Sequence, residues 1–334
     1  MRNLKDHPVG LLLWTGMLLG ATFPLGKMAA AAGVPPLIWA MVVSGGASLV
    51  LLPLGLAKGV LSVPRGQALR YVVISGSVSF ALINVMIFAL VPLVGAGQVG
   101  MMFALSPVTT LALSVLAGLR GPGRLGVAGI TLGMVGALLV AWGRGGLGDG
   151  AMTWSLVALL IPVVLAVGNV YRTLDWPEGV HPLALAFWSH LAAILGLVAV
   201  QLAMAGDLPL GRLVEVPGLA IIQAIAAGLT FPAYFRLQKV GGPVLLSQIG
   251  YVAAAVGLVS AVVFLGERYA ALVWCGAGII GGGIALTILA QTGRRPAFPA
   301  IFLGRRTRAR LVVRETARED GQRIYCQTCS RNTA

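Results

Sequence analysis

Long blocks without a single Asp, Glu, Lys or Arg dominate this sequence and limit what it can fold into. Residues 28–57, 71–119 and 269–293 contain no such side chain. Blocks of about 20 apolar residues match a bilayer core roughly 30 Å thick, since an α-helix rises about 1.5 Å per residue. Only 10% of the chain is charged, against roughly 25% in a soluble domain. The sequence therefore predicts an all-α polytopic membrane protein.

Ten apolar spans follow one another, separated by short joints rich in Pro, Gly or charge. They lie near residues 9–31, 37–57, 71–92, 97–119, 125–143, 152–172, 182–205, 217–236, 243–265 and 270–291. The first run is longer than the roughly 7–15 apolar residues of a signal peptide, so a retained helix is expected. Because the joints are short, sequential helices should be antiparallel neighbours.

The distribution of Lys and Arg predicts the orientation, because short cytoplasmic loops carry an excess of both. With the N-terminus inside, ten Lys or Arg fall on the inner side and four on the outer side. Ten more Arg lie in residues 294–334, also on the inner side. Both termini are thus expected in the cytoplasm, which an even number of spans allows. The expected location is the plasma membrane, or the inner membrane if the protein is bacterial.

An internal repeat at an offset near 146 residues divides the chain. Residues 33–37 (GVPPL) return as 179–183 (GVHPL), and Lys27 corresponds to Arg172. Gly129 and Gly136 return one residue later as Gly276 and Gly283. The predicted units are residues 8–143, residues 152–291 and a basic cytoplasmic tail, 296–334, expected to be disordered or loosely associated with the membrane.

Each repeat holds five helices, an odd number, so the second repeat must enter the membrane from the opposite side. The expected fold is two inverted five-helix repeats. Inverted repeats are typical of secondary transporters, because exchanging the conformations of two similar halves turns an inward-open protein into an outward-open one.

Four segments resemble the EamA-type members of the drug/metabolite transporter superfamily. Residues 20–27 (GATFPLGK) are similar to the family pattern WG-[ST]-x-F-x-x-x-K, with Leu19 in place of the Trp. Residues 105–108 (LSPV), 169–172 (NVYR) and 264–268 (FLGER) resemble further family elements. The resemblance implies a helix bundle around a central cavity and the export of metabolites, amino acids or drugs by alternating access.

Polar groups inside apolar spans supply the candidate site, since they are costly in lipid and usually face the bundle interior. The residues expected to bind substrate or to gate are Lys27, Asn84, Gln98, Asn169, Arg172, Gln223, Tyr234, Gln248 and Tyr251. Gln248 and Tyr251, three residues apart, are the leading pair because they can share a helix face. Pro24 and Pro107 are expected hinges, as Pro breaks a helical hydrogen bond.

Simpler roles remain open for the same residues. Lys27 and Arg172 lie near span ends, where long cations can reach toward water as interfacial anchors. The amides can hydrogen-bond between helices, and Tyr234 can lie at the interface. No carboxylate is expected at mid-membrane, so exchange or facilitated diffusion is simpler than coupling to a proton.

Other function classes find less support in the sequence. An intramembrane enzyme needs clustered His, Asp, Glu or Cys for its chemistry. A receptor or sensor signalling through the tail, and a channel, remain alternatives. Cys326 and Cys329 form a CxxC, but a zinc site needs about four ligands, so no metal and no cofactor is predicted. The expected partners are a small-molecule substrate and the lipid bilayer, not nucleic acid, and the oligomeric state is open.

Overall fold

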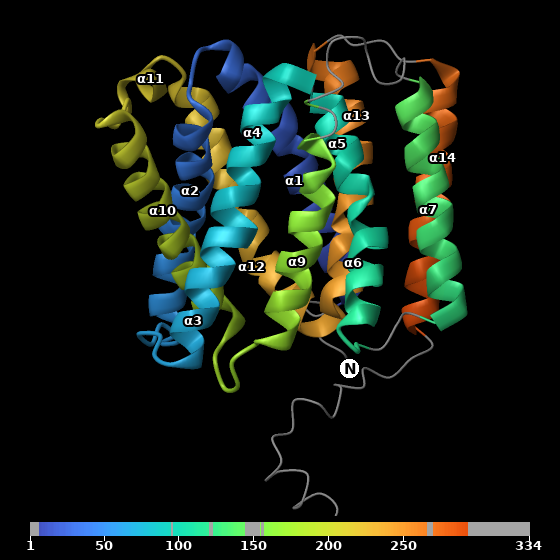
Figure 1. The fold of residues 1–334 in the computed structure, drawn as a ribbon, viewed down its shortest axis with the longest axis horizontal. Coiled ribbons are helices and arrows are strands. Elements are labelled where there is room, and N and C mark those ends of the chain that lie inside the picture. Colours follow the sequence, from blue (N-terminus) through green and yellow to red (C-terminus); the bar gives the residue numbers. More distant parts are fainter. Residues whose placement is uncertain are drawn as a thin grey trace, which may run out of the picture. The chain divides into compact units, whose positions relative to one another are not determined.

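The computed structural model describes residues 7–94, 96–119, 123–143, 154, 157–265 and 270–292. Within these ranges the secondary structure is helical, with no β-strand. The predicted tail, 296–334, and residues 266–268 of the family-like FLGER segment lie outside them. Figure 1 shows the helices side by side, with α1 beginning and α14 ending at the same end of the bundle. That arrangement is the one expected for an even number of spans.

The helices of the first repeat are α1 (Pro8–Ala31), α2 (Pro36–Ala57), α3 (Gln67–Ile74), the π-helical segment η2 (Ser75–Leu82), α4 (Ile83–Val94), α5 (Ala96–Ala104), α6 (Ser106–Leu116) and α7 (Gly123–Gly143). Those of the second are α9 (Leu160–Leu174), α10 (Pro182–Ala205), the short α11 (Gly211–Val214), α12 (Pro217–Ser247), α13 (Ile249–Leu265) and α14 (Ala271–Thr292). The chain runs through α3, η2 and α4 as one continuous span.

Two predicted spans are interrupted or extended. The span predicted at 97–119 is two helices, because Pro107 has no N–H for a bond to the carbonyl of Phe103 and the chain breaks at Leu105. The helix predicted to end near residue 236 continues farther, and the chain turns at Gly242, whose φ of 70° suits glycine. A second break at Gln248 separates α12 from α13.

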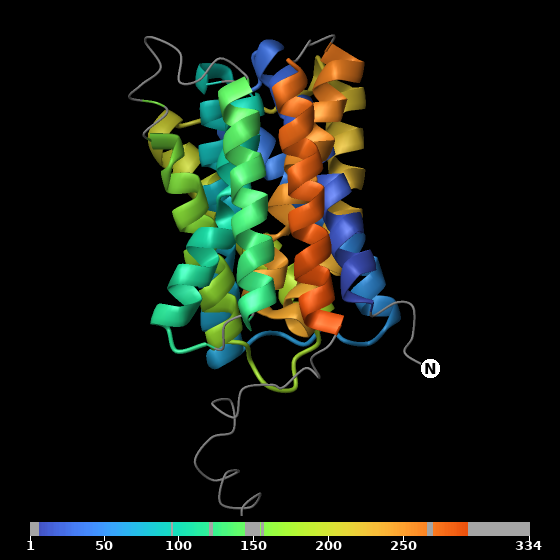
Figure 2. The same cartoon turned by 90° about the vertical axis from the view of Figure 1, so that its right-hand side faces the viewer.

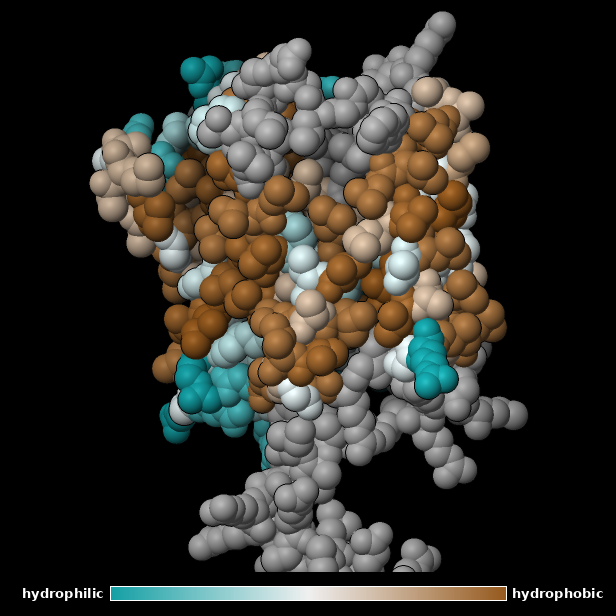
Figure 3. Space-filling model, turned by 45° about the vertical axis from the view of Figure 1, so that its right-hand side comes forward, coloured by the Kyte–Doolittle hydropathy of each residue, from teal (hydrophilic) through white to brown (hydrophobic). Residues whose placement is uncertain are grey.

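Apolar side chains cover much of the bundle surface. Figure 3 shows them over most of the visible face, with hydrophilic side chains toward its upper and lower margins. Leu49, Leu116 and Met204 are each more than 70% exposed. A soluble protein rarely exposes large apolar patches, so this surface fits lipid.

Five spans are long and apolar enough to cross a bilayer. They are Pro8–Ala31, Pro36–Ala57, Gln67–Val94, Pro182–Ala205 and Pro217–Ser247. Shorter apolar helical segments of 10 to 17 residues among the described residues are Met102–Leu116, Gly123–Gly136, Leu160–Leu174, Ile249–Ser260 and Ala271–Thr287. The described part of the chain is thus all-helical and consistent with a polytopic membrane protein, while ten spans remain a prediction.

The last long helix of each repeat packs against the other. Figures 1 and 2 both show α7 and α14 side by side. A Cβ added to Gly129 would lie 2.7 Å from the carbonyl oxygen of Gly283, and one added to Gly136 would lie 2.6 Å from that of Gly276. Rising numbers in α7 thus face falling numbers in α14, so these two helices are antiparallel. Gly129 thus lies against Gly283, the repeat counterpart of Gly136, and Gly136 lies against Gly276, the repeat counterpart of Gly129.

Contacts between α2 and α10 follow the same symmetry. His190 Nδ1 lies 3.4 Å from Ser44 Oγ, and these residues are 146 positions apart, the offset of the repeat. A residue that touches its own counterpart lies beside a twofold axis. Phe103 and Gly250, nearly one repeat apart, also touch, between α5 and α13.

Candidate functional site

A buried polar cluster joins α6, α9 and α12 around Arg172. This arginine belongs to the last turn of α9, and its side chain is only 1% exposed. We call the hydrogen-bonded group around it the Arg172 cluster, made of Thr110, Asn169, Arg172, Thr173, Tyr234 and Gln238. Thr110 comes from the first repeat and the other members from the second. The cluster therefore bridges the two halves of the chain.

One nitrogen of the guanidinium makes all the hydrogen bonds of Arg172 in the structure. Nη2 donates to Asn169 Oδ1 at 2.7 Å and to the hydroxyl oxygen of Tyr234 at 2.6 Å, and lies 3.5 Å from Gln238 Oε1. Asn169 lies one helical turn before Arg172, so α9 itself brings these two side chains together. Tyr234 and Gln238, four residues apart on α12, complete the acceptors.

The acceptors are themselves held in place. Gln238 Nε2 donates to the main-chain carbonyl of Asn169 at 3.1 Å and to Thr173 Oγ1 at 2.5 Å. Asn169 Nδ2 lies 3.4 Å from Thr110 Oγ1. These bonds fix which amide atom faces the guanidinium, since the nitrogens of both amides are engaged elsewhere. The oxygens are thereby left to accept from Arg172.

Aromatic rings line the guanidinium on two sides. Arg172 Cζ lies 5.2 Å from the centre of the Tyr234 ring and 5.7 Å from that of Phe80. Both distances fall within the roughly 6 Å range of a cation–π contact. Phe80 belongs to the π-helical segment η2, and it also contacts His190 and Phe231. The cation is thus enclosed by ring faces that attract it but cannot neutralise it.

Two of the three guanidinium nitrogens have no hydrogen-bond partner. Arg172 Nε and Nη1 are buried without an acceptor in the described protein, and the same holds for the hydroxyl of Ser79. A Cβ at Gly168 would lie 3.2 Å from Nη1 and would overlap Ser79 Oγ. The unused donors of Arg172 and Ser79 therefore lie on the same side of Gly168, where the lack of a side chain lets Ser79 approach α9 closely.

Arg172 also has no carboxylate partner among the described residues. Ion pairs of this kind form elsewhere, between Arg70 and Asp175 and between Arg212 and Glu215. A buried cation without a counter-ion is costly, because its loss of hydration is not repaid by an opposite charge. The cluster is therefore charged and incompletely bonded, which is typical of a site that receives a ligand.

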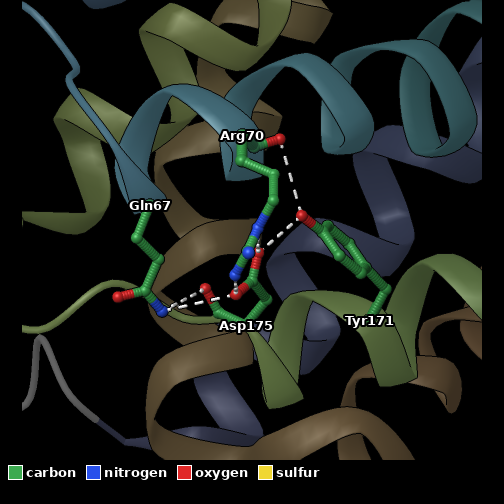
Figure 4. A network of polar contacts seen from close by, with 4 residues as sticks. All are labelled: Gln67, Arg70, Tyr171 and Asp175. Atoms are coloured by element: carbon green, nitrogen blue, oxygen red, sulfur yellow. Dashed lines mark hydrogen bonds and ion pairs between the residues drawn. The ribbon is translucent and has the colours of Figure 1, made fainter.

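A second polar network closes the end of the bundle at which α1 begins. Figure 4 shows Asp175, directly after α9, with Gln67 and Arg70 of α3 and with Tyr171. Arg70 pairs with the Asp175 carboxylate, Nε lying 3.0 Å from Oδ2, and the Tyr171 hydroxyl donates to Oδ2 at 2.7 Å. Burial by itself would raise the pKa of Asp175, but the bonds from Arg70, Tyr171 and Gln67 hold that pKa below its ordinary value. The network joins the two repeats.

Replacing Asp175 by Asn is expected to lower the melting temperature of the purified protein at pH 7. The folded pKa lies below the unfolded value of about 3.9, so the carboxylate contributes its full stability above that pH and loses it as pH falls through the folded pKa. The difference between wild type and Asp175→Asn should therefore be the same at pH 7 and pH 5. Glu215→Gln, which breaks the exposed Arg212–Glu215 pair, is the control and should change little. An equal effect of both variants would contradict the role of this network.

The structure brings three of the residues predicted from the sequence into one cluster: Asn169, Arg172 and Tyr234. An interfacial anchor keeps its charge in water, so the burial of Arg172 disfavours that alternative. Lys27 is half-buried in α1. Asn84 donates to the carbonyl of Phe80 one turn earlier, at 2.7 Å. The side chain of Gln98 lies outside the described residues.

The leading pair from the sequence is not joined to the cluster by a hydrogen bond in the structure. Tyr251 donates to the carbonyl of Ile130 at 3.0 Å and packs against Gly133, so its ring lies against α7. Gln248, at the break before α13, and Gln223, in α12, are both fully buried, and both amide ends of each lack a partner in the described protein. Pro24 is buried inside α1, and Pro107 lies in the first turn of α6, two residues after the break at Leu105.

Sequence reasoning missed three members of the cluster, Thr110, Thr173 and Gln238, and the neighbouring Ser79 and Phe80. Gln238 lies beyond the predicted end of its helix at residue 236, yet it follows Tyr234 by four positions, and this spacing was the signal for a shared face. Ser79 and Phe80 lie in η2, where the wider π-helical turns change which side chains point inward. Nothing in the local sequence marks them.

The comparison with protein families decides the identity of the fold. The model described as "EamA-like transporter family" matches residues 8–142 and again residues 152–289. The chain belongs to the EamA-like transporter family. Two tandem matches agree with the repeat inferred from the sequence, and an EamA family member of the drug/metabolite transporter superfamily is a membrane protein that transports small molecules.

Comparison with solved structures agrees with the fold. A structure described as "Crystal structure of protein" superposes with a TM-score of 0.66 at 20% sequence identity, over 86% of this EamA chain and 99% of its own. Such a likeness carries the fold alone. No curated protein sequence matches the chain significantly. Among the described residues, no group of three or more His, Cys, Asp or Glu is placed to hold a metal ion.

Proposed function

We propose that this EamA protein is a secondary transporter that exports a small molecule by alternating access. In this proposal ten helices form two inverted halves of five, residues 8–143 and 152–291, that exchange conformations around the Arg172 cluster. Both termini lie in the cytoplasm of a cell bounded by the plasma membrane, the inner membrane in a bacterium. Export is the common activity in the family that the chain resembles.

Reciprocal contact between the halves is the observation that carries the proposal. Gly129 faces Gly283 while Gly136 faces Gly276, and Ser44 touches His190 exactly one repeat away. Contacts of this kind support a twofold axis that relates the repeats. With an axis in the membrane plane, two halves of similar energy can exchange their conformations, which is the basis of alternating access.

The position of the polar groups supports the same mechanism. The Arg172 cluster joins α6 of one half to α9 and α12 of the other, so movement of the halves changes its shape. The Asp175 network joins α3 to the end of α9 on the side proposed to be cytoplasmic. In the proposal the cluster holds the substrate and the network closes its path on that side.

Counterflow in proteoliposomes tests the function. A labelled compound from a metabolite and drug panel should enter faster when the same compound is loaded inside, because a carrier returns faster when occupied. Tyr234→Phe should reduce this exchange about tenfold or more, because it removes the hydroxyl that holds the Arg172 guanidinium in position through a hydrogen bond worth about 1.5–3 kcal/mol. Tyr71→Phe is the matched control, because that buried hydroxyl has no partner in the described protein.

Two results would overturn the proposal. Ion conductance without counterflow would indicate a channel. Reporters inserted near Lys58 and Asp207 on the same side of the membrane would rule out the inverted arrangement, which requires them on opposite sides.

A further inference from the structure

We infer that the substrate of this transporter is a small organic anion bearing one carboxylate, which binds to the unused donors of Arg172. The inference rests on the proposed transport function and specifies its substrate class. It excludes the cationic drugs and zwitterionic amino acids as preferred substrates.

The donors that remain free define the ligand. Nε and Nη1 of Arg172 together carry three N–H groups, and the Ser79 hydroxyl supplies a further donor. The N–H groups can only donate hydrogen bonds, and the Ser79 hydroxyl can donate one. Ser79 Oγ and Arg172 Nη1 lie on the same side of Gly168. A ligand that satisfies them must present acceptors, and an oxyanion does so with charge-assisted bonds.

The number of charges selects a carboxylate over a phosphate. The Arg172 cluster contains one cation and no second Lys or Arg, so one negative charge neutralises it. A phosphate with a charge near −2 would leave about one negative charge unpaired among aromatic rings, at high cost. A carboxylate also presents two oxygens, one to accept from an N–H of Nη1 and one to accept from the Ser79 hydroxyl on the same side of Gly168.

The absence of an acid from the cluster excludes a positive group on the substrate. Asn169, Tyr234 and Gln238 point their oxygens at Arg172 already, so none is left to pair with an ammonium. Gly168 is the remaining feature. Its missing side chain lets Ser79 Oγ lie close to α9 on the side of Nη1, since a methyl group there would overlap Ser79 Oγ. We therefore read Gly168 as the residue that lets Ser79 and Nη1 face the same carboxylate.

Thermal unfolding of the full-length protein in detergent tests the inference with probes that share one ring and differ in charge. Benzoate and benzenesulfonate should raise the melting temperature, because a ligand that binds only the folded state stabilises it. Benzylamine, phenylalanine and benzamide should not, and phenyl phosphate should act more weakly than benzoate.

Variants of Arg172 then locate the site. Arg172→Gln should weaken benzoate binding roughly 10- to 100-fold, the cost of losing hydrogen bonds to a charged partner. The unliganded variant should melt no lower than wild type, because it loses an uncompensated buried charge, whereas an arginine needed only for structure would leave a destabilised protein. Arg172→Lys should bind benzoate with intermediate strength. Arg212→Gln, at an exposed arginine, should bind it as wild type does.

Each other outcome overturns the inference. Equal benzoate shifts in wild type and Arg172→Gln would place the anion elsewhere, and a stronger effect of phenyl phosphate would select phosphate. Stabilisation by benzylamine or phenylalanine alone, or by no anion, would reject the anionic substrate. If these binding results failed but any panel compound still showed counterflow, only the anionic substrate class would be rejected and the transport function would stand. If no compound showed counterflow and the reporters at Lys58 and Asp207 lay on the same side, both the transport function and the substrate class would be rejected.

Discussion

Asn169→Asp is expected to raise the melting temperature of the unliganded protein and to lower its affinity for benzoate, and so its transport of benzoate, at least tenfold. Asn169 Oδ1 already accepts from Arg172 Nη2 at 2.7 Å, and Asp has nearly the same shape. The new carboxylate would neutralise the buried guanidinium with a charge-assisted bond, roughly twice as strong as a neutral one. We expect a gain of about 1–3 kcal/mol in stability from neutralising this charge. A neutralised arginine no longer needs a substrate anion, so affinity should fall at least tenfold.

Asn84→Asp is the matched control for Asn169→Asp, which is expected to raise stability and lower transport. Asn84 donates Nδ2 to the carbonyl of Phe80, and a carboxylate there cannot donate and would face that oxygen. The control should therefore destabilise the protein, while Asn169→Asp should stabilise it. Melting curves and benzoate counterflow of both variants make the comparison. If Asn169→Asp destabilised the protein as Asn84→Asp does, Arg172 would not be short of a counter-ion.

Helix ends with strong local signals were predictable from the sequence. The span predicted at 182–205 agrees with α10, which begins with Pro182 after His181, whose ring accepts from the N–H of Leu183. It ends before Gly206, in the left-handed conformation that favours glycine. Pro at the start and Gly after the end are local features, so a single sequence reveals them.

Helix faces were not predictable in the same way. In a soluble helix, polar residues mark the side that faces water, but here lipid-facing and core-facing residues are equally apolar. Phe80 of the core and exposed Leu116 look alike in the sequence, although their exposed fractions are 2% and 84%. For the same reason the direction of Tyr251, toward α7, could not be read from its position. Polar residues gave the useful signal, and they found three members of the Arg172 cluster.

Breaks within spans depend on partners far away in the sequence. Pro107 predicted a disturbance in its span, and the helix does break at Leu105, two residues after Phe103. The sequence could not show what lies against the freed carbonyl. That partner is Gly250, almost 150 residues later, and its importance follows from the packing alone.

Gly250→Ala is expected to cause a large loss of folded protein, because a methyl group there would overlap the carbonyl oxygen of Phe103. Ala improves helix propensity by at most about 1 kcal/mol. Overpacking typically costs about 1–3 kcal/mol, and here the obstacle is main chain, which cannot change rotamer, so the clash should dominate. Gly257→Ala in the same helix is the control: its methyl group would meet Phe23 at an ordinary 3.4 Å, so the propensity gain should dominate.

The two alanine variants should therefore change the melting temperature in opposite directions, measured by the monomer remaining after heating in detergent.

The same contact should also affect the movement of the two halves. The contact between Gly250 and Phe103 lies near the proposed axis. Because Gly250 has no side chain, the main chains of α5 and α13 can shift past each other at this contact. The Gly250→Ala variant, assayed at a low temperature at which it stays folded, should therefore exchange substrate more slowly than the Gly257→Ala variant. If the Gly250→Ala variant were as stable as wild type and exchanged substrate as fast, α5 and α13 would not approach so closely. The two halves would then not pivot at this contact.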